Sequence, residues 1–329
     1  MKKILFALCA VATFASCSND EVVNFDKEAI AFDGAFVDNG TRAADNFTIE
    51  TNELLDFAVW ATTQRPSSTE IVPILDSVIV SRTSTSTPWV YGAEFTQYWI
   101  PRNTYQFAAA KNYKKDGVEL TNGVPSKFTY DATSQADLLY AADTRVGVEA
   151  GANAAVAFTF DHLLAKAYFT INTEAMSGHN ANYTYRITNV CINNAVKEAT
   201  YDVASKTWGD VTANYTAVNP LTFNDVNARG KLAAGQTYTS ALARLLIPAS
   251  YTDSNKLNIT CTIETLYGDS VIDVQNYNKS IAQEFVKGFV YNFVMALKDP
   301  GQPIEFTVTK VNEWVKAGDA NGNTAIPGL

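Results

Sequence analysis

Histidine and the common catalytic motifs are scarce or missing in this chain of 329 residues. Its two histidines, His162 and His179, lie outside any metal-binding spacing such as H-E-x-x-H. The G-x-S-x-G, P-loop and G-x-G-x-x-G patterns are also missing, so the sequence lacks the usual signals of serine hydrolases and nucleotide-binding proteins. We therefore predict no enzyme, no cofactor and no metal site. His162 begins an apolar run, which favours a hydrogen-bonded structural histidine.

Basic charge is limited too. Lys and Arg number 25 against 34 Asp and Glu, for a formal net charge of −9. An acidic chain repels phosphate backbones, and no basic cluster overrides that repulsion, so nucleic acid is not among the predicted partners. Charged residues make up only 18% of the sequence, whereas Thr, Asn, Val, Tyr and Phe are abundant. Because strands and turns favour these residues, the composition indicates an all-β fold.

The first 16 residues have the pattern of an export signal. Two lysines at 2–3 precede an apolar run over 4–14, and small residues at 15–16 precede Cys17. The run is too short to span a bilayer, which needs about 20 residues, and no later segment approaches that length. The pattern resembles a bacterial lipobox, which implies lipidation at Cys17 and anchoring to the outer membrane. The alternative is an ordinary secretory signal cut near residue 15.

A polar segment, Ser18-Asn19-Asp20-Glu21, follows Cys17. It resembles the surface-export signal of anaerobic Gram-negative bacteria, which implies a surface-exposed protein. The residues that remain exceed the size of about 250–300 at which single cores tend to split into domains. We predict four parts: a lipoprotein signal peptide (1–16), a polar tether (17–27), an N-terminal β-sandwich domain (28–160) and a C-terminal β-sandwich domain (161–329).

Alternation of apolar and polar side chains, which is typical of strands, recurs along the body. In residues 28–37 the alternating set is Ile30, Phe32, Gly34 and Phe36. This segment is therefore a candidate strand with one apolar face.

Further alternation predicts several more strands. Residues 289–297 and 304–308 alternate on either side of a Pro/Gly turn and predict a hairpin. Residues 71–80 are typical of a strand pair or one bent strand. Residues 134–142 favour one or two helical turns, and little else is helical. Many short strands with frequent turns indicate β-sandwiches.

Cysteine and tryptophan each leave two interpretations. Cys191 and Cys261 lie in apolar strand patterns, so they form a disulfide or remain small buried hydrophobic residues. Tryptophans stack on sugars in binding modules, but large rings also fill sandwich cores. We favour the core for most of the five, which are Trp60, Trp89, Trp99, Trp208 and Trp314.

Several short motifs follow one another in an order that resembles the fimbrillin family. These motifs are Ala29-Ile30-Ala31-Phe32 with Thr41-Arg42-Ala43, Tyr98-Trp99-Ile100-Pro101 with Tyr105-Gln106-Phe107-Ala108-Ala109, Phe158 to Lys166, Leu246-Ile247-Pro248, and Gly288 to Phe293 leading through Ile304-Glu305-Phe306 to Trp314. The family comprises lipoprotein precursors of type V fimbriae and Mfa-like surface proteins of anaerobic Gram-negative bacteria.

The resemblance implies two tandem transthyretin-like β-sandwich domains and a structural or adhesive subunit of a surface fimbria. It also implies that a protease cuts between Arg42 and Ala43 and removes the first strand, with Ile30, Phe32 and Phe36. A strand of another fimbrial subunit then fills the groove, because an open sheet edge accepts an added strand. The partners expected are other subunits, in a homo- or hetero-polymer.

Alternative functions remain open. The tail over 315–329 has few apolar residues and does not alternate like a donor strand, which would suit a tip or anchor subunit. A monomeric surface lipoprotein that binds host or bacterial glycans or proteins is the second interpretation. A hydrolase without a recognisable acid and base is the third.

Overall fold

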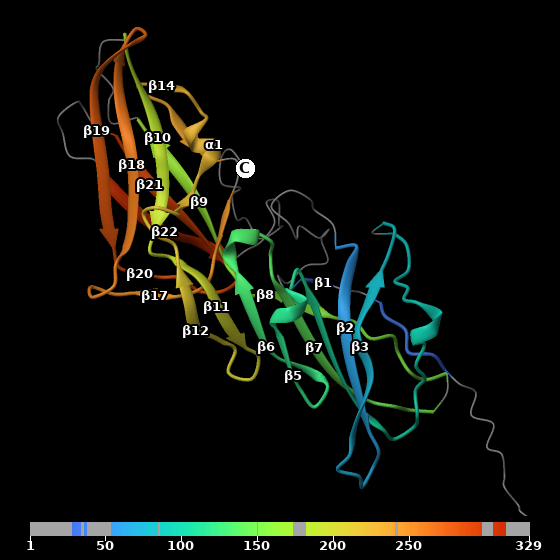
Figure 1. Cartoon of the computed structure of the whole chain (residues 1–329). Helices are drawn as coiled ribbons and strands as arrows, with labels where there is room; N and C mark the ends of the chain where they lie inside the picture. Colours follow the sequence, from blue (N-terminus) through green and yellow to red (C-terminus); the bar gives the residue numbers. More distant parts are fainter. Residues whose placement is uncertain are drawn as a thin grey trace, which may run out of the picture.

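Strands make up most of the structure, a computed structural model, and confirm the predicted all-β class (Figure 1). Helical segments are short: α1 (Asn224–Asn227) and the 3-10 turns η1 (Ala93–Phe95), η2 (Lys115–Gly117) and η3 (Ala132–Ser134). No helix in the described part of the chain is long and apolar enough to cross a membrane. The structure describes residues 28–33, 36–37, 54–84, 86–149, 151–173, 182–240, 243–297 and 305–313.

A six-stranded sheet built from the first half of the chain has apolar side chains buried on both faces. In its strand β2, Phe57, Val59 and Ala61 point into one core, while Ala58 and Trp60 point into another. Successive side chains of a strand point to opposite faces, which explains why this strand is a continuous apolar run. The strands lie in the order β1 (Phe36–Val37), β8 (Thr159–His162), β7 (Leu139–Val146), β4 (Thr104–Lys111), β2 (Asp56–Gln64) and β3 (Ile71–Ser81).

The core on the Phe57 face is called the first core. It includes Phe107 of β4 and Phe158, together with Ile30 and Phe32 from the segment that begins the described chain. Trp89 and Trp99 are buried in it, and Trp60 is buried on the opposite face of the sheet. The core interpretation of tryptophan is confirmed for these three residues.

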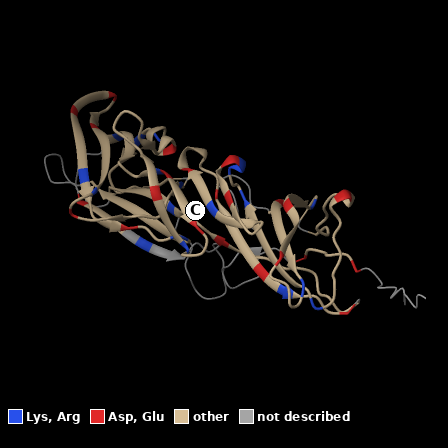
Figure 2. Ribbon diagram, turned by 60° about the horizontal axis from the view of Figure 1, so that its bottom comes forward, with Lys and Arg blue, Asp and Glu red and all other residues tan. Residues whose placement is uncertain are grey.

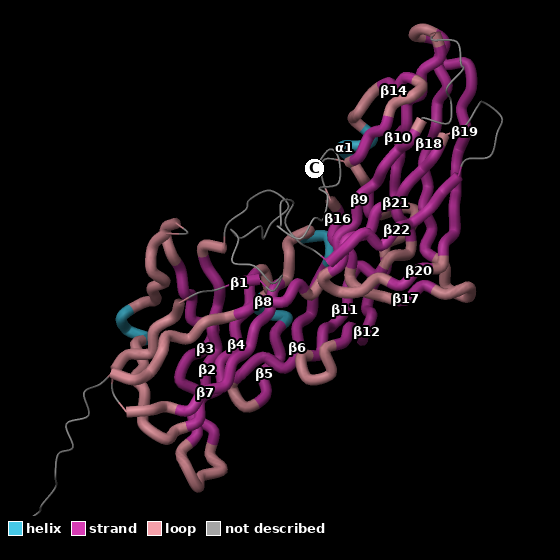
Figure 3. Tube along the Cα trace, turned by 180° about the vertical axis from the view of Figure 1, so that it is seen from behind, coloured by secondary structure: helices cyan, strands magenta, loops and turns pink. Residues whose placement is uncertain are grey.

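A four-stranded sheet contains strands from both halves of the sequence. Strand β6 of the first half pairs with β11 of the second half, from Lys127 opposite Asp202 to Asp131 opposite Glu198 (Figure 3). The boundary predicted at 160/161 falls inside β8, so the halves are joined both by the chain and by this pairing. Division into two tandem domains remains a prediction. The strand order is β12 (Thr207–Asn214), β11 (Val196–Asp202), β6 (Val124–Asp131) and β5 (Val118–Thr121).

Two five-stranded sheets dominate the second half. One contains β13 (Leu221–Thr222), β10 (Tyr183–Asn193), β18 (Leu257–Tyr267) and β19 (Ser270–Ile281) in that order, with β14 (Lys231–Ala233) also on β10. The other contains β15 (Thr237–Thr239), β9 (Ala165–Asn172), β21 (Phe289–Ala296) and β22 (Glu305–Glu313), with β16 (Arg244–Leu246) also on β9. The short strands β17 (Ser250–Tyr251) and β20 (Gln283–Glu284) pair with each other.

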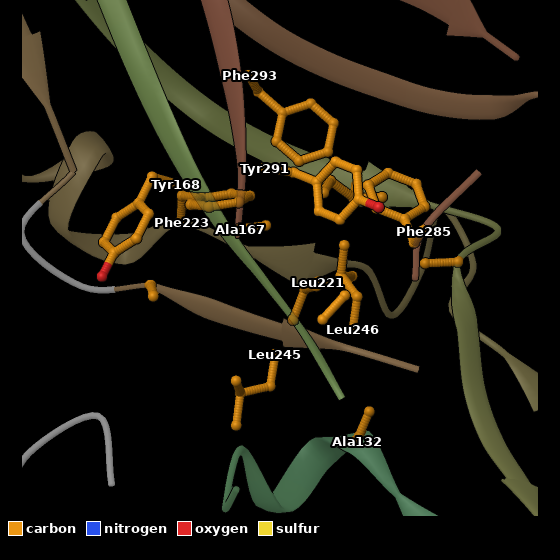
Figure 4. Close-up of a cluster of buried hydrophobic side chains, with 14 of the residues drawn as sticks. Ala132, Ala167, Tyr168, Leu221, Phe223, Leu245, Leu246, Phe285, Tyr291 and Phe293 are labelled. Atoms are coloured by element: carbon orange, nitrogen blue, oxygen red, sulfur yellow. The ribbon is translucent and has the colours of Figure 1, made fainter. Parts of the chain in front are cut away.

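The larger hydrophobic core, called the second core, includes buried side chains of both five-stranded sheets. It also continues to Trp60 and to Phe128 of β6. Figure 4 shows aromatic rings gathered in it; the ring centroids of Phe285 and Tyr291 lie 4.7 Å apart, and those of Phe285 and Phe293 lie 6.0 Å apart. The first pair meets edge to face and the second is tilted; such ring contacts add to the stability that burial of the rings supplies.

The local predictions had mixed outcomes. The hairpin is confirmed, because β21 pairs antiparallel with β22. Residues 71–80 belong to one strand with two register irregularities against β2. The helical turns expected over 134–142 were wrong: only η3 is helical there, and the chain then enters β7, where pairing with β4 and β8 overrides the local pattern.

Candidate functional site

The segment over residues 28–33 lies between two other segments and hydrogen-bonds to both. On one side the Ile30 N–H donates to the Gln97 carbonyl at 2.8 Å, and the Trp99 N–H donates to the Glu28 carbonyl at 2.9 Å. On the other side the Val156 N–H donates to the Ala31 carbonyl at 2.8 Å. The segment is therefore an inserted strand in a groove, which we call the first-strand groove.

The first-strand groove continues beyond residue 33. The Asp33 N–H donates to the Val156 carbonyl at 3.0 Å. Further along, β1 pairs parallel with β8, with Phe36 opposite Thr159 and Val37 opposite Phe160. The described residues before and after 34–35 thus both pair with the segment over 156–160. The side chain of Phe36 lies outside the described part of the structure.

Two apolar side chains of the inserted strand point into the first core. Ile30 is 1% exposed and Phe32 is 5% exposed, whereas Ala29, Ala31 and Asp33 are exposed. This is the alternation that the sequence predicts. Burial of two such side chains stabilises the docked strand by roughly 1.5–3 kcal/mol each.

Phe32 fills a pocket of aromatic rings. Its ring centroid lies 5.5 Å from that of Tyr91, 6.4 Å from that of Phe107 and 6.0 Å from that of Phe158. These three rings come from different parts of the first half, so one side chain joins several elements of the first core. Without this strand, the rings would face water unless another apolar side chain replaced Phe32.

The carboxylate of Glu28 fixes the beginning of the inserted strand. Its Oε2 atom accepts hydrogen bonds from Asn153 Nδ2 at 2.7 Å and from the Gly151 N–H at 2.9 Å. The side chain of Asn153, followed by the backbone N–H groups of Gly151 and Asn153, lowers the pKa of Glu28 below its ordinary value. These bonds favour the ionised carboxylate, so they favour the docked strand most at neutral pH.

Tyr105 and Gly147 contact the groove edge over residues 98–100 and hold it in place. The Tyr105 hydroxyl accepts a hydrogen bond from the Ile100 N–H at 2.7 Å and donates to the Tyr98 carbonyl at 3.3 Å. A Cβ atom at Gly147 would lie 2.4 Å from the Ile100 carbonyl oxygen, so only glycine permits this close approach. Tyr105 thus supports the segment Tyr98-Trp99-Ile100-Pro101, which forms the edge that binds the inserted strand.

The inserted strand is joined to the rest of the protein through a single stretch of chain, residues 38–53. That stretch contains Arg42 and Ala43, the predicted processing site. Both residues, and the predicted lipid-bearing Cys17, lie outside the described residues. A single peptide-bond cut in this stretch would leave the inserted strand attached only by non-covalent contacts.

Residues 41–314 match the family model described as fimbrillin-like. The chain belongs to the fimbrillin-like family. The family match begins one residue before Arg42 and leaves the inserted strand outside it. No curated protein matches this chain.

Solved structures also resemble this fimbrillin-like chain. A fimbrial protein from Bacteroides vulgatus is 15% identical with a TM-score of 0.60; the match covers 88% of this chain and 100% of that one. A proposed cell adhesion protein from Bacteroides uniformis is 19% identical with a TM-score of 0.51, covering 87% and 99%. Another from Bacteroides ovatus is 14% identical with a TM-score of 0.52, covering 89% and 99%. These likenesses concern the fold.

The disulfide that the sequence left open is not formed in the fimbrillin-like chain, where Cys191 and Cys261 are both free and buried. Cys191 pairs with Thr260, the residue before Cys261, so the two thiols point to opposite faces of one sheet. Cys261 belongs to the second core, and burial raises the pKa of its thiol to about 12. A thiol of that pKa stays protonated at neutral pH and is a poor nucleophile.

His162 has the structural, hydrogen-bonded role that the sequence predicts. His162 Nδ1 lies 2.6 Å from Asp137 Oδ2, and both side chains are buried where the halves meet. Burial raises the pKa of the Asp137 carboxyl, although His162 and Lys166 oppose that shift. The pair joins β8 to the loop before β7. His179 lies outside the described residues.

Charge and potential metal ligands give no second site on the fimbrillin-like chain. Along the described ribbon, basic and acidic positions are interspersed and form no basic stretch (Figure 2). No group of three or more His, Cys, Asp or Glu residues among those described could bind a metal ion. The first-strand groove is therefore the strongest candidate. Sequence reasoning found Ile30 and Phe32 by alternation but missed Glu28 and Asn153, whose contact depends on residues 125 positions apart.

Proposed function

We propose that this fimbrillin-like chain is a structural or adhesive subunit of a cell-surface fimbria that assembles by donor-strand exchange. In this proposal the chain is exported as a lipoprotein, anchored to the outer membrane by lipid on Cys17, and cut between Arg42 and Ala43. The cut releases the inserted strand, and a strand of the next subunit takes its place. The names of the structural relatives, a fimbrial protein and cell adhesion proteins, agree with such a role.

The observation that carries the proposal is the position of Ile30 and Phe32. A strand that fills part of a core, and is tied to the protein through one stretch of chain, is suited to replacement by a strand of similar pattern. The donor needs apolar side chains at alternate positions to fill the pockets of Ile30 and Phe32. It also needs backbone groups opposite Gln97, Trp99 and Val156.

The burial of three tryptophans bears on the alternative function. Stacking of Trp60, Trp89 or Trp99 on a sugar would need these rings to be exposed, whereas all three are buried. The remaining support for a glycan-binding role is correspondingly smaller. The fimbrial subunit is therefore the better-supported function.

Replacement of Arg42 tests the proposal directly. In the native organism, the protein sheared from the wild-type cell surface should begin at Ala43, and the Arg42→Ala variant should retain lipid-modified Cys17 as its first residue. Mass spectrometry of the N-terminal peptide identifies each form. Wild-type protein should also give high-mass ladders that resist denaturant, and Arg42→Ala should lose them.

A matched control is Arg65→Ala, which removes an exposed arginine from the turn between β2 and β3. It should leave both the first residue and the ladders unchanged. Ladders that persist in Arg42→Ala would contradict the cleavage step. A wild-type protein found only with lipidated Cys17 would favour the anchored, monomeric alternative.

A further inference from the structure

Strand β19 ends its sheet and pairs with β18. No strand in the described ranges lies beside its other edge. Its nine residues from Asp273 to Ile281 pair with β18 without a register shift, which makes this a long and regular edge. Edge strands expose backbone N–H and C=O groups that can pair with another chain, and proteins commonly interrupt such edges.

Two other long edge strands, β3 and β12, are interrupted more often than β19. Strand β3 contains Pro73, and its pairing with β2 has two register irregularities. The pairing of β12 with β11 also has two register irregularities. By comparison, β19 has no proline, and its single irregularity precedes Asp273. From Asp273 to Ile281 the edge of β19 therefore lacks the proline and the register irregularities that interrupt β3 and β12.

Apolar side chains are exposed along β19. Ile272 is 54% exposed and Val274 is 52% exposed, beside Val271 at 43%. The strand has one acidic and one basic residue, Asp273 and Lys279, which are both exposed. An exposed edge that combines apolar residues with balanced charge favours association rather than repulsion.

The charges of β19 are arranged for pairing with a copy of itself. In an antiparallel pair centred on Asn276, Asp273 of each copy lies opposite Lys279 of the other. Opposite charges at facing positions stabilise a strand pair, and like charges destabilise it. Shifting the centre by one residue in either direction removes both Asp–Lys pairs. A parallel in-register pair would place Asp273 beside Asp273.

We propose that two copies of this protein associate through β19, in an antiparallel strand pair with its two-fold axis at Asn276. The contact is closed and self-complementary, because each copy supplies the same strand. The two sheets become one continuous sheet across the axis. The proposal does not depend on strand exchange, since the first-strand groove belongs to the other half of the chain.

The area of one strand pair is small, so the association is expected to be weak in dilute solution and strong where copies are concentrated on a surface. On a fimbria or a membrane it would connect neighbouring copies side by side. Strand exchange, in contrast, would connect subunits through the first core. The two contacts could therefore act together in one assembly.

Cysteine cross-linking tests the register. In the chain from Ser18 to Leu329, which contains every described residue and carries Arg42→Ala to prevent processing, Asn276→Cys places one thiol on the two-fold axis. Facing residues of an antiparallel pair have Cα atoms about 4.5–5.5 Å apart, within the range of about 4.4–6.8 Å that a disulfide spans, so mild oxidation should give a disulfide-linked dimer. The native Cys191 and Cys261 are buried and supply no competing thiol.

The matched control is Asn278→Cys, at a residue of the same strand that is exposed like Asn276. In the proposed register its two copies lie four residues apart along the strand, or about 13 Å, so they should not cross-link. Equal cross-linking of the two variants would overturn the register. Failure of Asn276→Cys to cross-link at any protein concentration would overturn the proposal.

Charge exchange tests the energetics in the same Arg42→Ala background. Asp273→Lys or Lys279→Asp alone should raise the dimer dissociation constant about tenfold or more, since two attractive pairs become two repulsive pairs. The double variant should return it near the starting value. Sedimentation equilibrium gives the constant, and Asp116→Lys, an exposed site of the first half, is the control. A dimer insensitive to both single exchanges would place the contact elsewhere and overturn the proposal, as would a chain that stays monomeric.

Discussion

The first and second cores differ in how they are closed. The first core is covered partly by the inserted strand, which reaches it from the beginning of the described chain and is tied to β2 through residues 38–53. The second core lies between two sheets and includes buried side chains of their long strands β10, β18 and β21. A core with a separate covering strand can be opened without unfolding its sheet. A core closed by its own central strands cannot.

A strand can therefore be exchanged in the first core, whereas the second core depends on strands that stay in place. In the first half, the groove edges at 97–99 and at 156–160 both hydrogen-bond to the inserted strand, so a replacement strand finds partners on both sides. In the second half, β18 has β10 on one side and β19 on the other. Removal of β18 would separate the sheet into two parts.

The largest expected effect comes from the second core. Phe293→Ala removes a fully buried ring that contacts Phe285 and Phe306. We expect the free energy of unfolding to fall by about 4 kcal/mol, because the lost ring leaves a cavity into which the surrounding side chains relax only partially. Chemical denaturation measures the loss. The control Val218→Ala, at a residue 96% exposed, should change it by less than about 0.5 kcal/mol.

A smaller and more local effect is expected in the first core. Phe32→Ala should weaken docking of the inserted strand by about 3 kcal/mol, because its ring leaves the pocket of Tyr91, Phe107 and Phe158. Hydrogen exchange should accelerate at residues 28–33 while the second half keeps its protection. Phe95→Ala, at an exposed ring of η1, is the control. Equal loss of protection throughout the chain would break the distinction between the two cores.

The smallest effect concerns Glu28 and depends on pH. Hydrogen bonds from Asn153 and Gly151 lower the pKa of Glu28 in the docked strand, so their contribution is present above the ordinary carboxyl pKa and is lost as the pH falls through the lowered value. Protection of the Ile30 and Trp99 amides, corrected for intrinsic exchange, should therefore decrease in acid. Glu28→Gln should reduce this pH dependence.

Asp33→Asn, an exposed carboxylate on the same segment, is the control for Glu28→Gln and should leave the pH dependence in place. An acid response that survives unchanged in Glu28→Gln would assign the response to other groups. It would also remove the proposed electrostatic contribution to closure of the first core.

Local periodicity predicted the parts of the structure that depend on one strand at a time. Alternation identified the inserted strand, with Ile30 and Phe32 inward, and the β21–β22 hairpin, because a half-buried strand must alternate. The same reasoning failed at 134–142, where Leu138, Leu139 and Ala141 are buried through sheet pairing rather than on one face of a helix.

Contacts between distant segments were beyond the reach of periodicity. The pairing of β6 with β11 joins residues about 70 positions apart, and neither strand carries a local signal for its partner. The bonds between Glu28 and Asn153 are of the same kind. The motif order did indicate the family, but the role of Tyr105 in supporting residues 98–100 became visible only when both segments had been placed in space.

The pairing of β6 with β11 also has a mechanical consequence. If the chain alone connected the two halves, residues 160–165 would act as a flexible hinge under lateral force. Here five facing residue pairs cross the same junction, and the buried Asp137–His162 contact lies beside it. Bending at the junction requires these contacts to break together. The junction therefore resists lateral force, and the two halves move as one stiff unit.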